Sequence, residues 1–139
     1  MKPTRTEIMQ EFLNGRNCAQ VVLGHYADAL GYDQEETDRM AACFAGGMFV
    51  GSTCGAVTGA LIAIGLSVPP EKARETALAF QKQFQARCGS CLCRELLGYD
   101  LSDPAQEQAA RDSGKLIDYC PTPVLAAIEI LDTLLDAEG

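Results

Sequence analysis

The chain contains 139 residues, of which 47% are hydrophobic and 22% charged, a balance typical of a folded globular protein rather than a disordered one. This length suits one domain with a sizeable hydrophobic core. The formal net charge of -8 opposes binding to phosphate backbones. No basic patch with interleaved aromatic side chains offsets that repulsion, so we expect no nucleic-acid partner.

Seven cysteines are present, a high number for a chain of this size. The polar N-terminal segment 1–7 lacks the apolar core of a signal peptide, which favours a cytoplasmic location. In that reducing compartment, cysteines indicate metal binding or redox chemistry rather than a framework of structural disulfides.

Helical spacing of apolar residues recurs along the chain, whereas strand-type alternation is weak. The first three helices are expected at 5–13, 17–30 and 34–45. Asn17 is a strong N-cap residue, and it places Cys18 in the first turn of the second helix. His25, the single histidine, falls on the same stripe as Cys18, where a core histidine is a commoner interpretation than a metal ligand.

The next stretch, 46–66, carries no charged residue and must be buried in protein or lipid. Glycines at 51, 55 and 59 recur every four residues, which on a helix forms a row that lets another backbone approach closely. A helix is predicted from Thr53 to Leu66, with Cys54 at its start. Glycine breaks and the lack of basic flanks argue against a membrane span.

The C-terminal half predicts an amphipathic helix at 71–87, a tight turn with a short helix that ends at Gly98, and a surface helix at 103–115 with a break at Ser113-Gly114. A last helix opens at Cys120-Pro121. The sequence therefore predicts an all-α fold, a compact bundle of about six to eight short helices, in a single domain covering 1–139.

Cysteines coincide with four predicted helix starts: Cys18, Cys54, Cys91 or Cys93, and Cys120. Free N–H groups and the helix dipole favour a thiolate there and lower its pKa from about 8.5. If these helix starts converge, their thiols form one pocket suited to disulfide exchange or metal binding. Cys43 is predicted to be a small core residue. The CxxC at 88–91 lacks the βαβ setting of thioredoxin-like proteins, and zinc would need further ligands from distant segments.

Several segments together resemble a known family: Asn17-Cys18-Ala19-Gln20, Gly46-Gly47-Met48, Cys54-Gly55-Ala56-Val57-Thr58-Gly59, Cys93-Arg94-Glu95-Leu96-Leu97-Gly98 and Cys120. They are similar to the C-GCAxxG-C-C family, whose proposed activity is redox chemistry, and the likeness spans nearly the whole chain. The family's four cysteines match Cys18, Cys54, Cys93 and Cys120, with Cys91 as an alternative to Cys93. Cys43, Cys88 and Cys91 are then additional. A related domain in split-Soret cytochromes is associated with an iron–sulfur centre.

The leading hypothesis is a redox protein whose four matched cysteines converge on one site. They would either hold an iron–sulfur cluster or another thiolate-bound metal, with Cys91 as a further candidate ligand, or cycle between dithiol and disulfide. The alternatives are a non-redox zinc or copper carrier and a structural helical protein with packing cysteines. The redox partner is unknown, and the glycine row and acidic surface are compatible with a homodimer.

Overall fold

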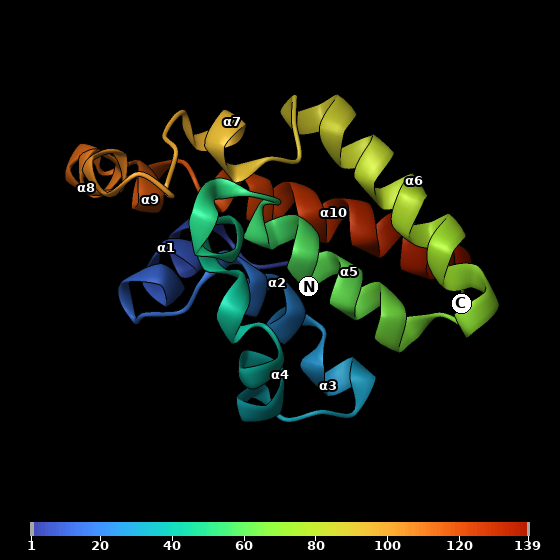
Figure 1. Ribbon diagram of the computed structural model, residues 1–139. Helices are drawn as coiled ribbons and strands as arrows, with labels where there is room; N and C mark the ends of the chain where they lie inside the picture. The colour runs from blue at the N-terminus through green and yellow to red at the C-terminus, as the bar shows by residue number, and fades with distance from the viewer. Residues whose placement is uncertain (1, 139) are drawn as a thin grey trace.

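The computed structural model describes residues 2–138, and its helices are joined by short connections (Figure 1). Ten α-helices occur in this part of the chain: α1 (Arg5–Leu13), α2 (Cys18–His25), α3 (Ala27–Leu30), α4 (Gln34–Met40), α5 (Gly55–Ser67), α6 (Pro70–Cys88), α7 (Cys93–Leu97), α8 (Pro104–Ser113), α9 (Lys115–Asp118) and α10 (Pro121–Glu138). A 3₁₀ turn, η1 (Ala42–Phe44), and a π-type turn, η2 (Gly47–Gly51), connect α4 to α5. The prediction of an all-α protein is confirmed.

The expected number of six to eight helices was too low, because two predicted helices are interrupted. The helix expected at 17–30 breaks at Tyr26, which has φ -102° and ψ 0°. The break expected at Ser113-Gly114 is confirmed at Gly114, which has φ +79°, and it divides that segment into α8 and α9. The helix expected at 34–45 ends at Met40 and continues only as η1. Helices of four or five residues make about one turn, which is too short to show a 3.6-residue period in the sequence.

Helix α5 lies at the centre and packs against α2, α6 and α10. A Cβ on Gly59 would lie 2.6 Å from the carbonyl oxygen of Ala19, and one on Gly55 would lie 3.2 Å from the Cβ of Cys18. The close approach predicted for the glycine row is therefore confirmed at these two positions. Gly51 was wrongly placed in the row, because it lies in η2 with φ +72°.

The buried hydrophobic residues form two clusters. The large cluster joins α1, α2, α5, α6 and α10, and Phe80 stacks on Phe84 within it, with ring centroids 5.8 Å apart. The small cluster gathers around α7, α8 and α9, which Figure 1 shows toward one end of the molecule; its buried residues are Cys93, Leu97, Leu101 and Ala110. Cysteines belong to both clusters: Cys18 and Cys54 pack with the large one, and Cys93 and Cys120 with the small one.

Among the helices described between residues 2 and 138, none combines the length and the apolar character needed to cross a bilayer. The uncharged stretch 46–66 is divided between η2 and the 13-residue α5. Most apolar side chains of α5 pack with the large cluster. The expectation that the whole stretch is buried was wrong, because Met48, Phe49 and Val50 in η2 and Leu66 in α5 are exposed.

Candidate functional site: a cavity lined by four cysteines

A cavity of about 430 Å³ lies at the junction of the two clusters. Four cysteines from segments far apart in the sequence line it: Cys18, Cys54, Cys93 and Cys120. The first two pack with the large cluster, whereas Cys93 and Cys120 pack with the small one. The cavity thus has two walls, each with a pair of sulfur atoms.

Each of the four cysteines lies at the start of a helix, as the sequence predicted. Cys18 and Cys93 are the first residues of α2 and α7, Cys54 is the N-cap residue of α5, and Cys120 directly precedes α10. Helix α5 begins at Gly55 rather than at Thr53, so Cys54 takes the cap position itself. Its thiol therefore lies beside the free N–H groups of the first turn.

The structure also separates Cys93 from its neighbours in sequence. Cys93 lines the cavity, whereas Cys88 and Cys91 do not. The N–H of Cys54 donates to the carbonyl of Cys91 at 2.8 Å, and the N–H of Cys93 donates to the carbonyl of Ser52 at 2.6 Å. With the isolated bridge between Thr53 and Leu92, these bonds tie the start of α5 to the start of α7.

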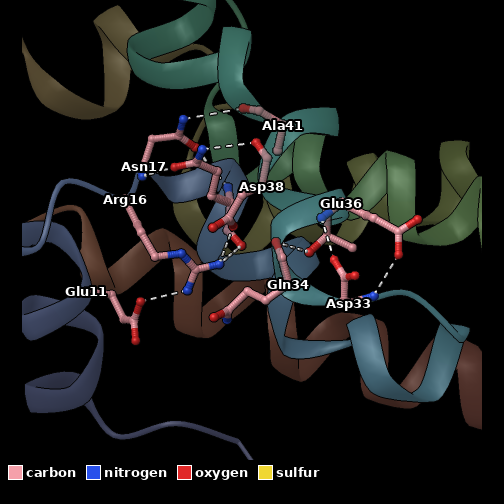
Figure 2. Close-up of polar contacts among 10 residues, drawn as sticks. Glu11, Arg16, Asn17, Asp33, Gln34, Glu36, Asp38 and Ala41 are labelled. Atoms are coloured by element: carbon pink, nitrogen blue, oxygen red, sulfur yellow. Dashed lines mark hydrogen bonds and ion pairs between the residues drawn. The ribbon is translucent and has the colours of Figure 1, made fainter.

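The start of α2 is fixed by a capping box and a partly buried ionic network (Figure 2). The Asn17 side chain accepts from the N–H of Gln20 at 2.8 Å and donates to the carbonyl of Ala41 at 3.3 Å. Arg16 pairs with Glu11 at 2.6 Å and with Asp38 at 2.7 Å. Together these contacts join α1, α2 and α4 beside Cys18, so the position of its Cα is set by three helices.

The pKa is raised at three of the four thiols of the cavity. Burial raises the pKa of Cys54 to about 12, against the N–H groups of Ala56 and Val57, which lower it. Burial also raises the pKa of Cys93 to about 11. The thiol of Cys120, followed by burial, raises the pKa of Cys18 well above its usual range.

Cys120 is the exception, because interaction with the Cys18 thiol lowers its pKa despite burial. The prediction that helix starts would lower every thiol pKa was therefore wrong for Cys18, Cys54 and Cys93. Removal of the sulfur from water is the largest effect at Cys54 and Cys93, whereas at Cys18 it adds to the larger effect of the Cys120 thiol. The pKa is thus lowered at Cys120 and raised at the other three thiols of the site.

The turn η2 forms part of the cavity wall in a strained backbone conformation. Met48 and Phe49 have φ +60° and +68°, in the left-handed region of the backbone that residues other than glycine rarely adopt. Phe49 lines the cavity, and its side chain is nevertheless 59% exposed. This turn was not predicted from the sequence, although the glycines at 46, 47 and 51, all of which have positive φ, are the residue type that such a turn requires.

Two other candidates lie away from the cavity. Cys43 is exposed rather than a core residue, because α4 ends at Met40 and the chain then turns through η1. His25 is half-buried, with its ring edge against Tyr26 at 4.9 Å between centroids, and it does not line the cavity.

The four thiols are soft donors, of the kind that hold zinc, copper(I) or an iron–sulfur cluster. Their chemistry therefore fits such a group. Among residues 2–138, however, no set of three or more His, Cys, Asp or Glu side chains is arranged as a ready metal site. A metal would require these sulfurs to move closer together.

Comparison with known families supplies one match. The family model described as "Putative redox-active protein (C_GCAxxG_C_C)" matches residues 16–134, a span that contains all four cavity cysteines. Comparisons with curated proteins and with solved structures gave no match.

Proposed function

The chain belongs to the C-GCAxxG-C-C family, and we propose that Cys18, Cys54, Cys93 and Cys120 form one redox centre that works by dithiol–disulfide exchange. The observation that carries this proposal is that Cys18 and Cys120, from the starts of α2 and α10, line the same cavity. Each thiol perturbs the other, and the pKa is lowered at Cys120 and raised at Cys18. A favoured thiolate beside a neutral, buried thiol provides an attacking and a resolving sulfur.

The proposed reaction starts when the Cys120 thiolate attacks a disulfide substrate. A mixed disulfide forms, and one substrate thiolate leaves. Cys18 then loses its proton and attacks the Cys120 sulfur, which releases the second substrate thiolate and leaves a Cys18–Cys120 disulfide. An external dithiol closes the cycle by reducing that disulfide, so two electrons pass from the dithiol to the substrate.

The remaining pair, Cys54 and Cys93, would be the second dithiol of the centre. Both thiols are buried, and the charge of Cys93 contributes to the raised pKa of Cys54 after the larger effect of burial. At neutral pH both are protonated, so they would react more slowly than Cys120.

Oxidation mapping tests this proposal. Reduced protein is treated with a low-molecular-weight disulfide, quenched in acid, alkylated and digested with trypsin. We expect a disulfide between peptides 17–39 and 116–139, which contain Cys18 and Cys120. Cys18→Ser should stop the reaction at a mixed disulfide on Cys120, and Cys43→Ser, at an exposed position, should behave as the unchanged protein. If Cys120 stays fully reduced, dithiol exchange at this centre is excluded.

A second candidate function rests on a different observation, namely that four thiols rather than two face one cavity. Cys18, Cys54, Cys93 and Cys120 would hold an iron–sulfur cluster, which supplies one-electron transfer when bound. Thiolates must form to bind a metal, and the cavity sulfurs raise one another's pKa. Bound cations would offset the repulsion between the thiolate charges.

Iron and acid-labile sulfide analysis of anaerobically purified protein distinguishes the two candidates. A cluster predicts both elements in fixed proportion to protein, lost in Cys120→Ser and retained in Cys43→Ser. Stoichiometric zinc or copper without sulfide would instead support a carrier. Neither metal nor sulfide, together with reversible loss of thiols on oxidation, rejects the cluster.

A further inference from the structure

Cys88 and Cys91 form a pair of thiols outside the cavity. Cys88 is the last residue of α6, and Gly89, with φ +95°, turns the chain back along that helix. The Cys91 sulfur then lies 3.7 Å from the carbonyl oxygen of Gln81, also in α6. Both thiols therefore lie along the C-terminal half of α6, Cys88 at its last residue and Cys91 against Gln81, and both are half-buried.

Open space lies beside Gly89 in the turn between the two cysteines. A Cβ on Gly89 would meet no heavy atom within 4 Å, apart from its chain neighbours. Two intervening residues also match the CxxC spacing of redox dithiols. Arg87 precedes the first cysteine, and its guanidinium lowers the pKa of Cys88, whereas burial, the larger effect, and the Cys91 thiol raise it.

The same segment is hydrogen-bonded to the cavity wall. The carbonyl of Cys91 accepts the N–H of Cys54, and the next residues pair with Thr53 and Ser52. Tyr119 lines the cavity. Burial raises the pKa of its phenol, and so do Cys88, Cys54 and Cys120, so Cys88 acts on the same phenol as two of the cavity cysteines.

We propose that Cys88 and Cys91 are a second dithiol–disulfide pair, oxidised by low-molecular-weight disulfides, whose state controls the reactivity of the cavity cysteines. The Cys88 thiolate attacks the small disulfide and releases one thiolate. Cys91 gives up its proton and attacks the Cys88 sulfur, which releases the second thiolate and leaves an intramolecular disulfide. The new covalent bond restrains the backbone at Cys91, and the hydrogen bond to Cys54 passes that restraint to the cavity. This inference goes beyond the proposed function and does not depend on it.

The disulfide is tested on the full chain, equilibrated with mixtures of reduced and oxidised glutathione, quenched in acid, alkylated and digested with trypsin. Cleavage after Arg87 and Arg94 isolates peptide 88–94, which contains Cys88, Cys91 and Cys93. Under oxidising mixtures we expect this peptide to lack two hydrogens and to carry one alkyl group, on Cys93. Fragment ions should place the bridge between Cys88 and Cys91.

The Cys91→Ser variant should retain a glutathione adduct on Cys88, because the resolving thiol is gone. Cys43→Ser is the matched control and should match the unchanged protein. A bridge that includes Cys93, or a peptide that remains fully alkylated in the most oxidising mixture, would overturn the proposal. So would glutathione adducts that accumulate in place of the internal disulfide.

Control of the cavity is tested by the alkylation rate of Cys54, read in peptide 40–72 and measured with the Cys88–Cys91 pair reduced and then oxidised. We expect a severalfold change in the unchanged protein and none in a variant with both cysteines replaced by serine. An equal rate in the two states would reject the regulatory role. Cys120 is read in peptide 116–139 and the pair in 88–94, so failure of this proposal is distinguishable from failure of exchange at Cys18 and Cys120.

Discussion

The two hydrophobic clusters differ in what holds them together. The large cluster buries long helices against one another and includes two stacked phenylalanines. The small cluster depends on α7 and α9, which have five and four residues. Helices this short are not stable alone and rely on tertiary contacts, such as the bond from the Lys115 ammonium to the carbonyl of Leu97 at 2.9 Å.

The comparison bears directly on the site, because each cluster supplies two of its four sulfurs. Cys18 and Cys54 are on the firm wall, held by α2 and α5. Cys93 and Cys120 are on the wall that we expect to open at lower free energy. Cys120, the proposed attacking thiol, therefore lies on the side that we expect to open first, where a substrate could reach it.

Truncating one side chain in each cluster gives the largest expected effects. Phe84 and Leu97 are 0% and 1% exposed. Phe84→Ala should lower the free energy of global unfolding by about 3–5 kcal/mol. Leu97→Ala should change global unfolding less but should speed the alkylation of Cys93 and Cys120. Urea denaturation and timed alkylation measure the two effects, and equal losses of global stability would remove the distinction between the clusters.

Forcing α2 and α5 apart is expected to lower the free energy of unfolding somewhat less than truncating Phe84. In Gly59→Ala, the new Cβ would meet the Ala19 carbonyl oxygen at 2.6 Å and its Cα at 2.9 Å, so α2 and α5 must move apart. We expect a loss of about 2–3 kcal/mol in urea denaturation, in the range of overpacked cores. Gly65→Ala is the matched control on the same helix, since its Cβ meets nothing within 4 Å. A gain in helix propensity should stabilise that variant by up to about 1 kcal/mol.

The buried thiols predict a fall in stability at alkaline pH. The pKa of Cys54 rises from 9.0 to about 12 on folding, so above pH 9 the unfolded chain releases a proton that the folded chain keeps. The free energy of unfolding should then fall as pH rises from about 9 to about 12, by up to about 1.4 kcal/mol per pH unit for this thiol. Denaturation at several pH values should show a smaller slope in Cys54→Ala and an unchanged slope in Cys43→Ala. The same slope in both variants would contradict the burial of a neutral Cys54.

The smallest expected effect concerns the cap that holds Cys18. Asn17→Ala removes a capping box and should cost about 1 kcal/mol, together with a changed alkylation rate at Cys18. Asp33→Ala removes the matching capping box of α4 and should cost a similar amount without altering Cys18. Thermal denaturation and peptide mapping check both. A change at Cys18 in both variants would show that general loosening, rather than the cap, controls its reactivity.

The sequence by itself determined the features that depend on neighbouring residues. Helix α1 was predicted at 5–13 with correct bounds, because local signals define both of its ends, including the Thr4–Glu7 capping box. Helix starts beside Cys18, Cys54 and Cys120 followed from Asn17, from the residues before α5 and from Pro121 in the same way. The family resemblance, which also rests on motifs along the chain, was confirmed by the match over 16–134.

Only the tertiary structure decided which sulfurs line one cavity and in which direction the pKa of each thiol is shifted. Cys91 and Cys93 have similar surroundings in sequence, yet only Cys93 reaches the cavity. The expected low pKa values were wrong at three cysteines, because burial at Cys54 and Cys93 and the Cys120 thiol at Cys18 raise the pKa, and both effects come from segments far away in the chain. Local signals placed each cysteine at a helix start, and the packing of α2, α5, α7 and α10 made those starts into two walls of one cavity.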